Sequence, residues 1–197
     1  MSIARSLLAL SLAALLSSAA LAQHKDVPFR GGIPVAPAGL ADKPLGDGPF
    51  DYATGEGQNI RVTVLTKALS YPFTLTFLPD STMLITQRDG KLRVMRNGKL
   101  DPNPVAGGPA SFSTGTSGLP GAVHGYMDIA LHPQFAQNRL VYLSHPKTGP
   151  KGTTLAISRG RFDGTTLTDV NEVFVADAWE KGGNLAGRIF FGPDGML

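Results

Sequence analysis

The chain of 197 residues contains no cysteine, and only 17% of its residues are charged. Without thiols it cannot form a disulfide framework, a thiolate zinc site or a cysteine nucleophile. The formal net charge is +3, and the basic residues are scattered among acids. No Lys/Arg stripe or aromatic–basic platform is present, which argues against nucleic acid as a partner.

Long apolar runs are also missing beyond residues 1–22, "MSIARSLLALSLAALLSSAALA". Here Arg5 precedes an apolar stretch that ends in a small-x-small cleavage site before Gln23, a pattern that predicts a secretory signal peptide. The alternative, a transmembrane anchor, requires a longer apolar run than Leu7 to Leu16 supplies. We therefore expect a periplasmic or secreted bacterial protein with no stable membrane insertion after cleavage.

Glycine and proline are plentiful instead, with 24 and 15 residues. Such a composition suits a fold with many turns, so we expect an all-β protein. Residues 23–57 are rich in both and show no sustained period, which predicts an extended N-terminal arm. We assign residues 58–197 to a partial β-propeller, for the reasons that follow.

Short apolar runs alternate with turn signals from "IRVTVLTKAL" onward. The strands "TMLITQR" and "KLRVMR" are each followed by a turn dipeptide, Asp89-Gly90 or Asn97-Gly98. These dipeptides adopt positive φ at low cost, which predicts two antiparallel hairpins. The same order recurs in "DIALHPQFAQNRLVYLSH" and "TTLAISRGRFDGTTL", and "NEVFVAD" is predicted as a further strand.

The turn prolines Pro79, Pro133 and Pro193 are separated by 54 and 60 residues. A four-stranded unit repeated at roughly 40–60 residues is typical of propeller blades. The chain has room for two such blades and the start of a third, and it ends just after the turn "GPDG". We expect a sequence truncated at its C-terminus, with apolar sheet faces left exposed at the broken edge.

Four blocks resemble the opening blades of soluble sugar dehydrogenases of the glucose/sorbosone dehydrogenase family, which includes aldose sugar dehydrogenases. They are "YPFTLTFLPDSTMLITQRDGKLRVMRNGK", "MDIALHPQFAQNRLVYLSH", "TTLAISRGRFDGTTLTDVNEVFVAD" and "GRIFFGPDGML". The resemblance implies a six-bladed β-propeller that holds pyrroloquinoline quinone (PQQ) and calcium on its axial face. It also implies oxidation of an aldose's anomeric hydroxyl to a lactone, with hydride passing to the quinone and a histidine acting as general base.

The same resemblance indicates candidate site residues. The family's H-x-x-G-R falls on Asn184 to Arg188, so Asn184, which cannot take a proton, stands at the base position. The family's GQGGLLD falls on Ala122 to Asp128, which puts Val123 at the position of a glutamine near the quinone. We expect Val123, His124 and Arg188 to contact the cofactor, with His124 as the candidate substitute base. The calcium ligands and further quinone-clamping basic residues would lie beyond Leu197.

Other polar residues of this region have more ordinary interpretations. His124, His132 and His145 are spaced by 8 and 13 residues, which does not fit a single-helix or loop zinc site. We expect these histidines at different strand ends, with His132 and His145 structural. Asp128 is predicted to be a turn or inter-blade hydrogen-bond residue. Arg188 begins an apolar strand, so it needs either a carboxylate inside the fold or an axial anionic ligand.

The leading hypothesis is thus a PQQ-dependent sugar dehydrogenase with a small-molecule sugar substrate. One alternative is a catalytically weakened, quinoprotein-like propeller that binds sugar or a protein partner, as Asn184 suggests. Another is an exported metal-dependent lactonase-type propeller, which would need clustered acidic ligands around its axis. The sequence leaves open which sugar is used, what accepts the electrons, and whether the protein forms a homodimer.

Overall fold

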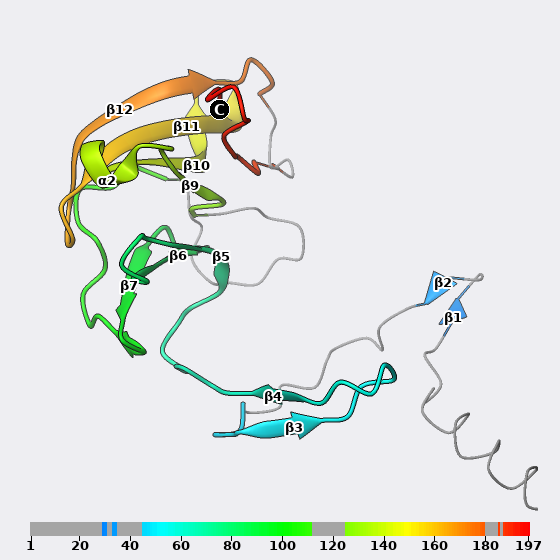
Figure 1. Ribbon diagram of the computed structural model, residues 1–197. Helices are drawn as coiled ribbons and strands as arrows, with labels where there is room; N and C mark the ends of the chain where they lie inside the picture. Colours follow the sequence, from blue (N-terminus) through cyan, green and yellow to red (C-terminus); the bar gives the residue numbers. More distant parts are fainter. Residues whose placement is uncertain (1–28, 31–32, 35–44, 112–124, 180–184, 186) are drawn as a thin grey trace, which may run out of the picture. The chain divides into compact units, whose positions relative to one another are not determined.

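The computed structural model describes residues 29–30, 33–34, 45–111, 125–179, 185 and 187–197 (Figure 1). The chain divides into two compact units, Met1–Gly46 and Asp47–Leu197. In the first unit, β1 (Phe29–Arg30) pairs antiparallel with β2 (Ile33–Pro34). The predicted signal peptide lies outside the described residues. Within the described ranges no helix has the length and apolar character to cross a membrane.

The second unit begins with a hairpin of β3 (Phe50–Tyr52) and β4 (Ile60–Val62). β4 lies within the predicted strand "IRVTVLTKAL" but is shorter, whereas β3 belongs to the Gly/Pro-rich stretch that we interpreted as an extended arm. Asp51 and Arg61 face each other across this hairpin, and the guanidinium donates two hydrogen bonds of 2.7 and 2.9 Å. Both side chains are exposed, so we assign this pair little stabilising value.

A first four-stranded antiparallel sheet follows in chain order (Figure 1). It consists of β5 (Pro72–Phe77), β6 (Met83–Gln87), β7 (Leu92–Arg96) and β8 (Lys99–Leu100). The predicted Asp-Gly and Asn-Gly hairpins are confirmed, and Gly90, Asn97 and Gly98 all have positive φ. These reversals keep sequence neighbours paired, which is how a propeller blade is built.

A second four-stranded sheet repeats this order. It consists of β9 (Ile129–Leu131), the short helix α2 (Phe135–Asn138), β10 (Leu140–Gly149), β11 (Gly152–Phe162) and β12 (Leu167–Val175). The prediction of "NEVFVAD" as a separate strand is wrong. β12 runs unbroken from Leu167, because a register shift beside Asp169, which has positive φ, lets the chain stay paired with β11.

An apolar core lies between the two sheets and takes side chains from both. Its buried members are Leu78, Leu84, Leu92, Val94, Tyr126, Ile129, Phe135, Val141, Leu143, Phe162 and Leu167. The first strands, β5 and β9, are in contact. The carbonyl of Ala106, which follows the first sheet, accepts a hydrogen bond of 2.8 Å from the N–H of Leu167 in β12. Two stacked meanders with adjacent first strands are neighbouring blades, so the all-β class and the partial β-propeller are confirmed.

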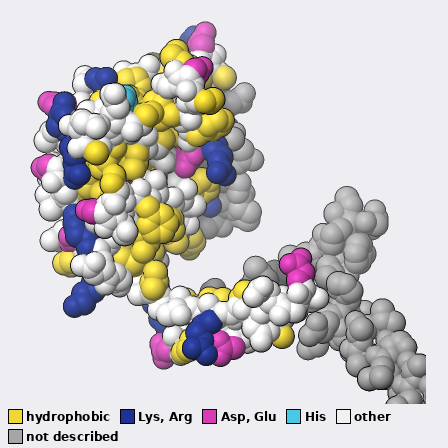
Figure 2. All heavy atoms as spheres, viewed as in Figure 1, with side chains coloured by type: hydrophobic (Ala, Val, Ile, Leu, Met, Phe, Trp, Pro, Cys, Tyr) yellow, Lys and Arg dark blue, Asp and Glu magenta, His cyan; other side chains and the backbone are white. Residues whose placement is uncertain are grey.

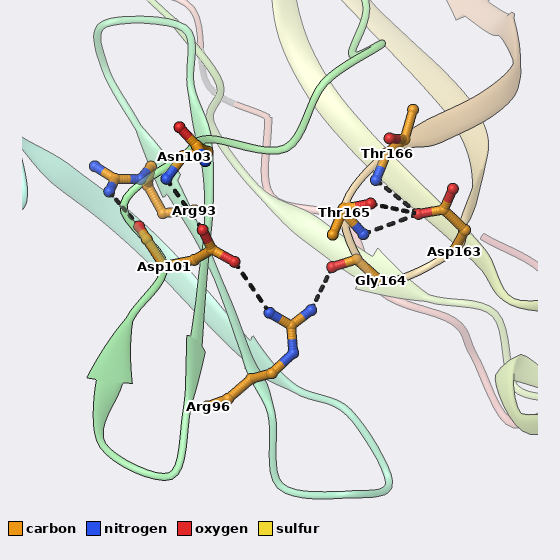
Figure 3. Close-up of polar contacts among 8 residues, drawn as sticks. All are labelled: Arg93, Arg96, Asp101, Asn103, Asp163, Gly164, Thr165 and Thr166. Atoms are coloured by element: carbon orange, nitrogen blue, oxygen red, sulfur yellow. Dashed lines mark hydrogen bonds and ion pairs between the residues drawn. The ribbon is translucent and has the colours of Figure 1, made fainter.

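A set of polar contacts also spans the interface between the two blades (Figure 3). Arg96 of β7 donates to the Asp101 carboxylate at 3.3 Å and to the carbonyl of Gly164 in the β11–β12 turn. Asp163 shapes that turn, because one of its oxygens accepts the N–H groups of Thr165 and Thr166, each at 2.8 Å. These two backbone bonds lower the pKa of Asp163. The Arg96 cation thereby joins the first blade to the second.

Apolar side chains remain exposed on the second unit, and Figure 2 shows hydrophobic groups gathered on one face of it. On β5 the exposed side chains are Phe73, Leu75 and Phe77, which alternate along one face of the strand. Phe174 of β12 is exposed as well, and so are Phe190 and Met196 in the segment that follows the second blade. Each outer sheet face therefore offers a surface of the kind that a neighbouring blade covers.

We predict that Gly107→Ala is markedly destabilising, because the new Cβ would lie 2.2 Å from the Leu167 carbonyl oxygen. Gly98→Ala is the matched control, since Gly98 has the same φ of +72° with nothing within 4 Å. Both variants place alanine in the left-handed region, which costs about 1–2 kcal/mol. Urea unfolding should show about 1–3 kcal/mol more loss for Gly107→Ala. Equal losses would contradict the close approach of the two blades.

Candidate functional site

Three of the four predicted site residues, Val123, His124 and Asn184, lie outside the described residues. The structure does describe the chain that follows each of them, from Gly125 and from Gly187. The first segment leads from the first blade into the second, and the other segment follows the second blade. The geometry of the site is therefore read from the contacts that hold these segments.

Thr86 holds the first of these segments. This β6 side chain is fully buried, and its hydroxyl accepts a 3.1 Å hydrogen bond from the Thr74 N–H of β5. The same hydroxyl donates at 2.8 Å to the carbonyl of Met127, just before β9. One hydroxyl thus links two strands of the first blade to the start of the second.

Ser144 repeats this arrangement in the second blade. It is fully buried in β10, and its hydroxyl accepts a 2.9 Å bond from the Asp128 N–H and donates to the carbonyl of Gly187. A Cβ at Gly187 would lie 2.8 Å from a Leu155 methyl and 2.9 Å from the Met127 side chain. We call Thr86 and Ser144 the hydroxyl clamps, since each hydroxyl holds a backbone carbonyl of the segment that follows its own blade.

Asp128 adds a second contact to the segment after Gly187. One carboxylate oxygen accepts the Ile129 N–H at 3.0 Å, and the other accepts the Ile189 N–H at 2.9 Å. Asp128 is thus a hydrogen-bond residue that joins the start of the second blade to the segment that follows this blade; the prediction was a turn or an inter-blade hydrogen-bond role. Further along, the ring centres of Phe191 and Tyr142 lie 5.2 Å apart, so this segment packs against the second blade.

Arg188 is the one predicted cofactor residue that the structure describes. Its side chain is exposed and lines a mostly apolar cleft with Phe190 and Met196. The same cleft also contains Asp194, but within the described ranges no carboxylate forms an ion pair with Arg188.

Tyr126 fixes the chain that follows His124. Its backbone N–H donates to the Gln87 carbonyl at 3.2 Å, and its hydroxyl donates to the Pro109 carbonyl at 2.7 Å. Burial raises the pKa of Tyr126 to about 12, so it stays a donor at neutral pH. Beside it, Gly125 has a φ of +72°, and a Cβ there would lie 2.3 Å from the Arg88 carbonyl. The position just after His124 is therefore set by the first blade.

His132 and His145 are structural, but the predicted strand-end position of His145 is wrong. The His132 Nδ1 accepts the Gln134 N–H at 3.0 Å in the turn before α2. His145 lies inside β10 and is 2% exposed, with its Nε2 2.9 Å from the Ser158 hydroxyl. β10 continues past Pro146 because β9 pairs only with Val141 to Leu143, so the proline faces no strand on that side.

A cleft beside His145 was missed by sequence reasoning. Its lining includes His145, Ser158, Lys147 and Glu172 from the second sheet, together with Pro109 and Ser111. Lys147 and Glu172 form an ion pair. Part of this cleft could have been predicted, because side chains alternate along a strand and residues 145 and 147 therefore share one face of β10. Their partners on β11 and β12 could not, because these depend on how the strands pair.

The described residues do not form a metal site. No group of three or more His, Asp or Glu side chains comes together in the described ranges in a way that could hold an ion. These residues therefore fit neither the calcium that the resemblance implies nor the acidic cluster that a metal-dependent lactonase would need. We assign no chemical step to a metal here.

Residues 69–197 match the sequence profile of the glucose/sorbosone dehydrogenase family. The chain belongs to this family. The aldose sugar dehydrogenase YliI of Escherichia coli is 36% identical over 143 residues, which cover 70% of this chain and 37% of that protein. An uncharacterised protein of Synechocystis sp. is 31% identical over 185 residues, which cover 87% of this chain and 45% of that protein.

Solved structures agree with this assignment. The soluble aldose sugar dehydrogenase of Escherichia coli in its apo-form has a TM-score of 0.51 at 34% identity, covering 59% of this chain and 33% of that one. The PQQ-bound aldose sugar dehydrogenase of Streptomyces coelicolor has a TM-score of 0.52 at 25% identity, covering 66% and 37%. The chain thus spans less than half the length of these relatives.

We predict that His145 makes the stability depend on pH. Burial lowers its pKa below 6.5, against the opposing effects of the Pro146 carbonyl and Glu172. As the pH is lowered, the unfolded chain therefore takes up this proton before the folded chain does, and stability falls below pH 6.5. Relative to His145→Gln, the free energy of unfolding of the wild type should fall by up to about 1.4 kcal/mol for each pH unit. A constant difference between the two proteins from about pH 5 to 8 would contradict this.

Proposed function

We propose that the protein is a PQQ-dependent dehydrogenase that oxidises the anomeric hydroxyl of an aldose sugar to a lactone. The observation that carries the proposal is the family match over residues 69–197. The relatives named aldose sugar dehydrogenase and the PQQ-bound relative support the substrate class and the cofactor. The signal-peptide pattern of residues 1–22 supports a periplasmic or secreted location.

One described residue, Arg188, is the candidate contact for PQQ that the family resemblance indicates. PQQ carries carboxylates, and Arg188 is an exposed cation with no ion pair inside the described ranges. Arg188 would bind one such group, and Val123 and His124 would complete the contact from the preceding segment. When bound, the quinone supplies the hydride acceptor, and the protein's own task is to hold the sugar and take its hydroxyl proton.

For the proton we propose His124 as the base. The positions of two residues in the chain support this. His124 lies three residues before Met127, whose carbonyl is held by Thr86, and Asn184 lies three residues before Gly187, whose carbonyl is held by Ser144. The two residues are thus at equivalent positions of successive repeats. Of the two, only the imidazole accepts a proton near neutral pH.

The proposal is tested on the protein purified from its native source. We expect an aldose to reduce an artificial dye only after PQQ and calcium have been added. The control omits PQQ but keeps the other components, which detects any reduction by the sugar alone. If no aldose gives a PQQ-dependent rate, the dehydrogenase proposal fails.

A second candidate, the catalytically weakened propeller that binds sugar or a protein partner, is favoured by Asn184 itself. The two candidates make different predictions for one pair of variants. If His124 is the base, His124→Gln should lower kcat by about 100-fold, the usual contribution of a general base. Asn184→Gln is the control, because it places the same glutamine at position 184 while retaining an amide there, and it should leave kcat nearly unchanged.

In a weakened enzyme, position 184 would still be the proper base site. Asn184→His would then raise kcat, and its pH profile would gain a basic group near the ordinary histidine pKa. An unchanged rate in Asn184→His, together with the loss in His124→Gln, is the result that our assignment predicts.

A further inference from the structure

We propose that the cleft beside His145 is a binding site for a neutral saccharide. The cleft has a volume of about 510 Å³, within the range of roughly 300–1,000 Å³ that is usual for small-molecule sites. None of its lining residues is a candidate base or a candidate contact for PQQ. The inference goes beyond the proposed function, because binding in this cleft needs neither the cofactor nor oxidation of the ligand.

His145 and Ser158 form the buried part of the lining, with 2% and 4% of their surfaces exposed. The His145 Nδ1 lies 3.3 Å from the Pro146 carbonyl oxygen, which can only accept a hydrogen bond, so this nitrogen carries the ring proton. The Nε2 atom, 2.9 Å from the Ser158 Oγ, then accepts the hydroxyl proton. Burial lowers the pKa of His145, which keeps the ring neutral at neutral pH. This part of the cleft therefore carries no charge, and the Ser158 oxygen keeps lone-pair capacity for a ligand hydroxyl.

Lys147 and Glu172 form the charged part of the lining, and their charges cancel. They lie on β10 and β12, the strands on either side of β11, so their ion pair bridges β11. One carboxylate oxygen accepts from the ammonium group, and the other has no partner in the described part of the chain. An anion in the cleft would compete with Glu172 for the lysine, and a cation would compete with Lys147 for the carboxylate. A neutral ligand hydroxyl can donate to the open carboxylate oxygen and leave the pair intact.

Ser111 adds a hydroxyl oxygen that is buried and has no hydrogen-bond partner among the described residues. Buried polar atoms are nearly always paired, and a bound ligand or water would supply the missing partner. The lining also includes the apolar residues Pro109, Ala110 and Val170. Hydrogen-bonding groups beside apolar surface match a sugar ring, whose edge carries hydroxyl groups and whose faces carry C–H groups. A neutral saccharide is therefore the class of ligand that this lining fits.

The test measures binding of methyl α-glucoside by isothermal titration calorimetry, with the protein purified from its native source and without PQQ. This sugar has no free anomeric hydroxyl, so the proposed dehydrogenase reaction cannot consume it. The methyl glycosides of glucuronate and glucosamine, which carry one negative or one positive charge on the same ring, are the charged comparisons. We expect methyl α-glucoside to bind at least about fivefold more tightly than either of them, because a charged ring must compete with the ion pair.

Two variants, Lys147→Met and Glu172→Gln, test whether the sugar binds in this cleft. Both side chains are partly exposed, so their replacement leaves the buried core unchanged. Each variant should weaken methyl α-glucoside binding about tenfold, the usual loss of one charge-assisted hydrogen bond. Lys91→Met is the matched control, because it also removes a lysine from an ion pair, with Asp89, but lies outside the cleft. It should change the affinity by less than about twofold.

Several results would overturn the inference. If the wild type does not bind methyl α-glucoside, or if Lys147→Met and Glu172→Gln bind it as the wild type does, the cleft is not a saccharide site. If only His124→Gln weakens binding, the sugar occupies the candidate catalytic position instead. Tighter binding of either charged glycoside would show that the cleft selects a charged ligand. None of these results decides the proposed function, which the PQQ-dependent dye assay tests separately. A failed dye assay with this binding intact would remove the proposed function and leave the saccharide site standing.

Discussion

The structure depends on one buried hydroxyl in each blade. Thr86 and Ser144 are both fully buried, and each donates to a backbone carbonyl of the segment that follows its own blade. A buried carbonyl without a partner costs about 1–3 kcal/mol, so the hydroxyl is required once the segment packs there. The apolar core supplies the attraction between the blades, while the hydroxyl clamps fix the path of the segment after each blade. Asp128 and Tyr126 then hold neighbouring residues of these segments.

The function follows from the same constraint. In a propeller the segments between blades carry the chemistry, and their positions are set by the blades that they join. Here Gly125 to Met127 and Gly187 to Ile189 are fixed by backbone hydrogen bonds and by close contacts at glycines. The family assignment says what such segments serve in the relatives. The proposed roles of His124 and Arg188 rest on their distance along the chain from these fixed points.

Local signals in the sequence predicted the fold well, and contacts between distant residues account for what they missed. Asp89-Gly90 and Asn97-Gly98 predicted the hairpins, since turn dipeptides act locally, and Asp128 was predicted to be a hydrogen-bond residue. The single strand β12 was missed because a register shift, and not a turn, accommodates Asp169. The burial of His145 and the hydroxyl clamps were missed as well. A threonine or serine in a strand is unremarkable in the sequence, and the hydrogen-bond partners of Thr86 and Ser144 lie 41 and 43 residues away.

The most direct test of this account is hydrogen exchange in Thr86→Val, with Thr154→Val as the control. Both threonines are fully buried and bond backbone carbonyls, but Thr154 bonds Ala176 and Ala178 within the second blade's own chain segment. If Thr86 couples the blades, Thr86→Val will speed exchange in the first blade and also around Met127 and β9. Faster exchange confined to β5 and β6 would contradict the account, because it would mean that the hydroxyl stabilises its own blade alone.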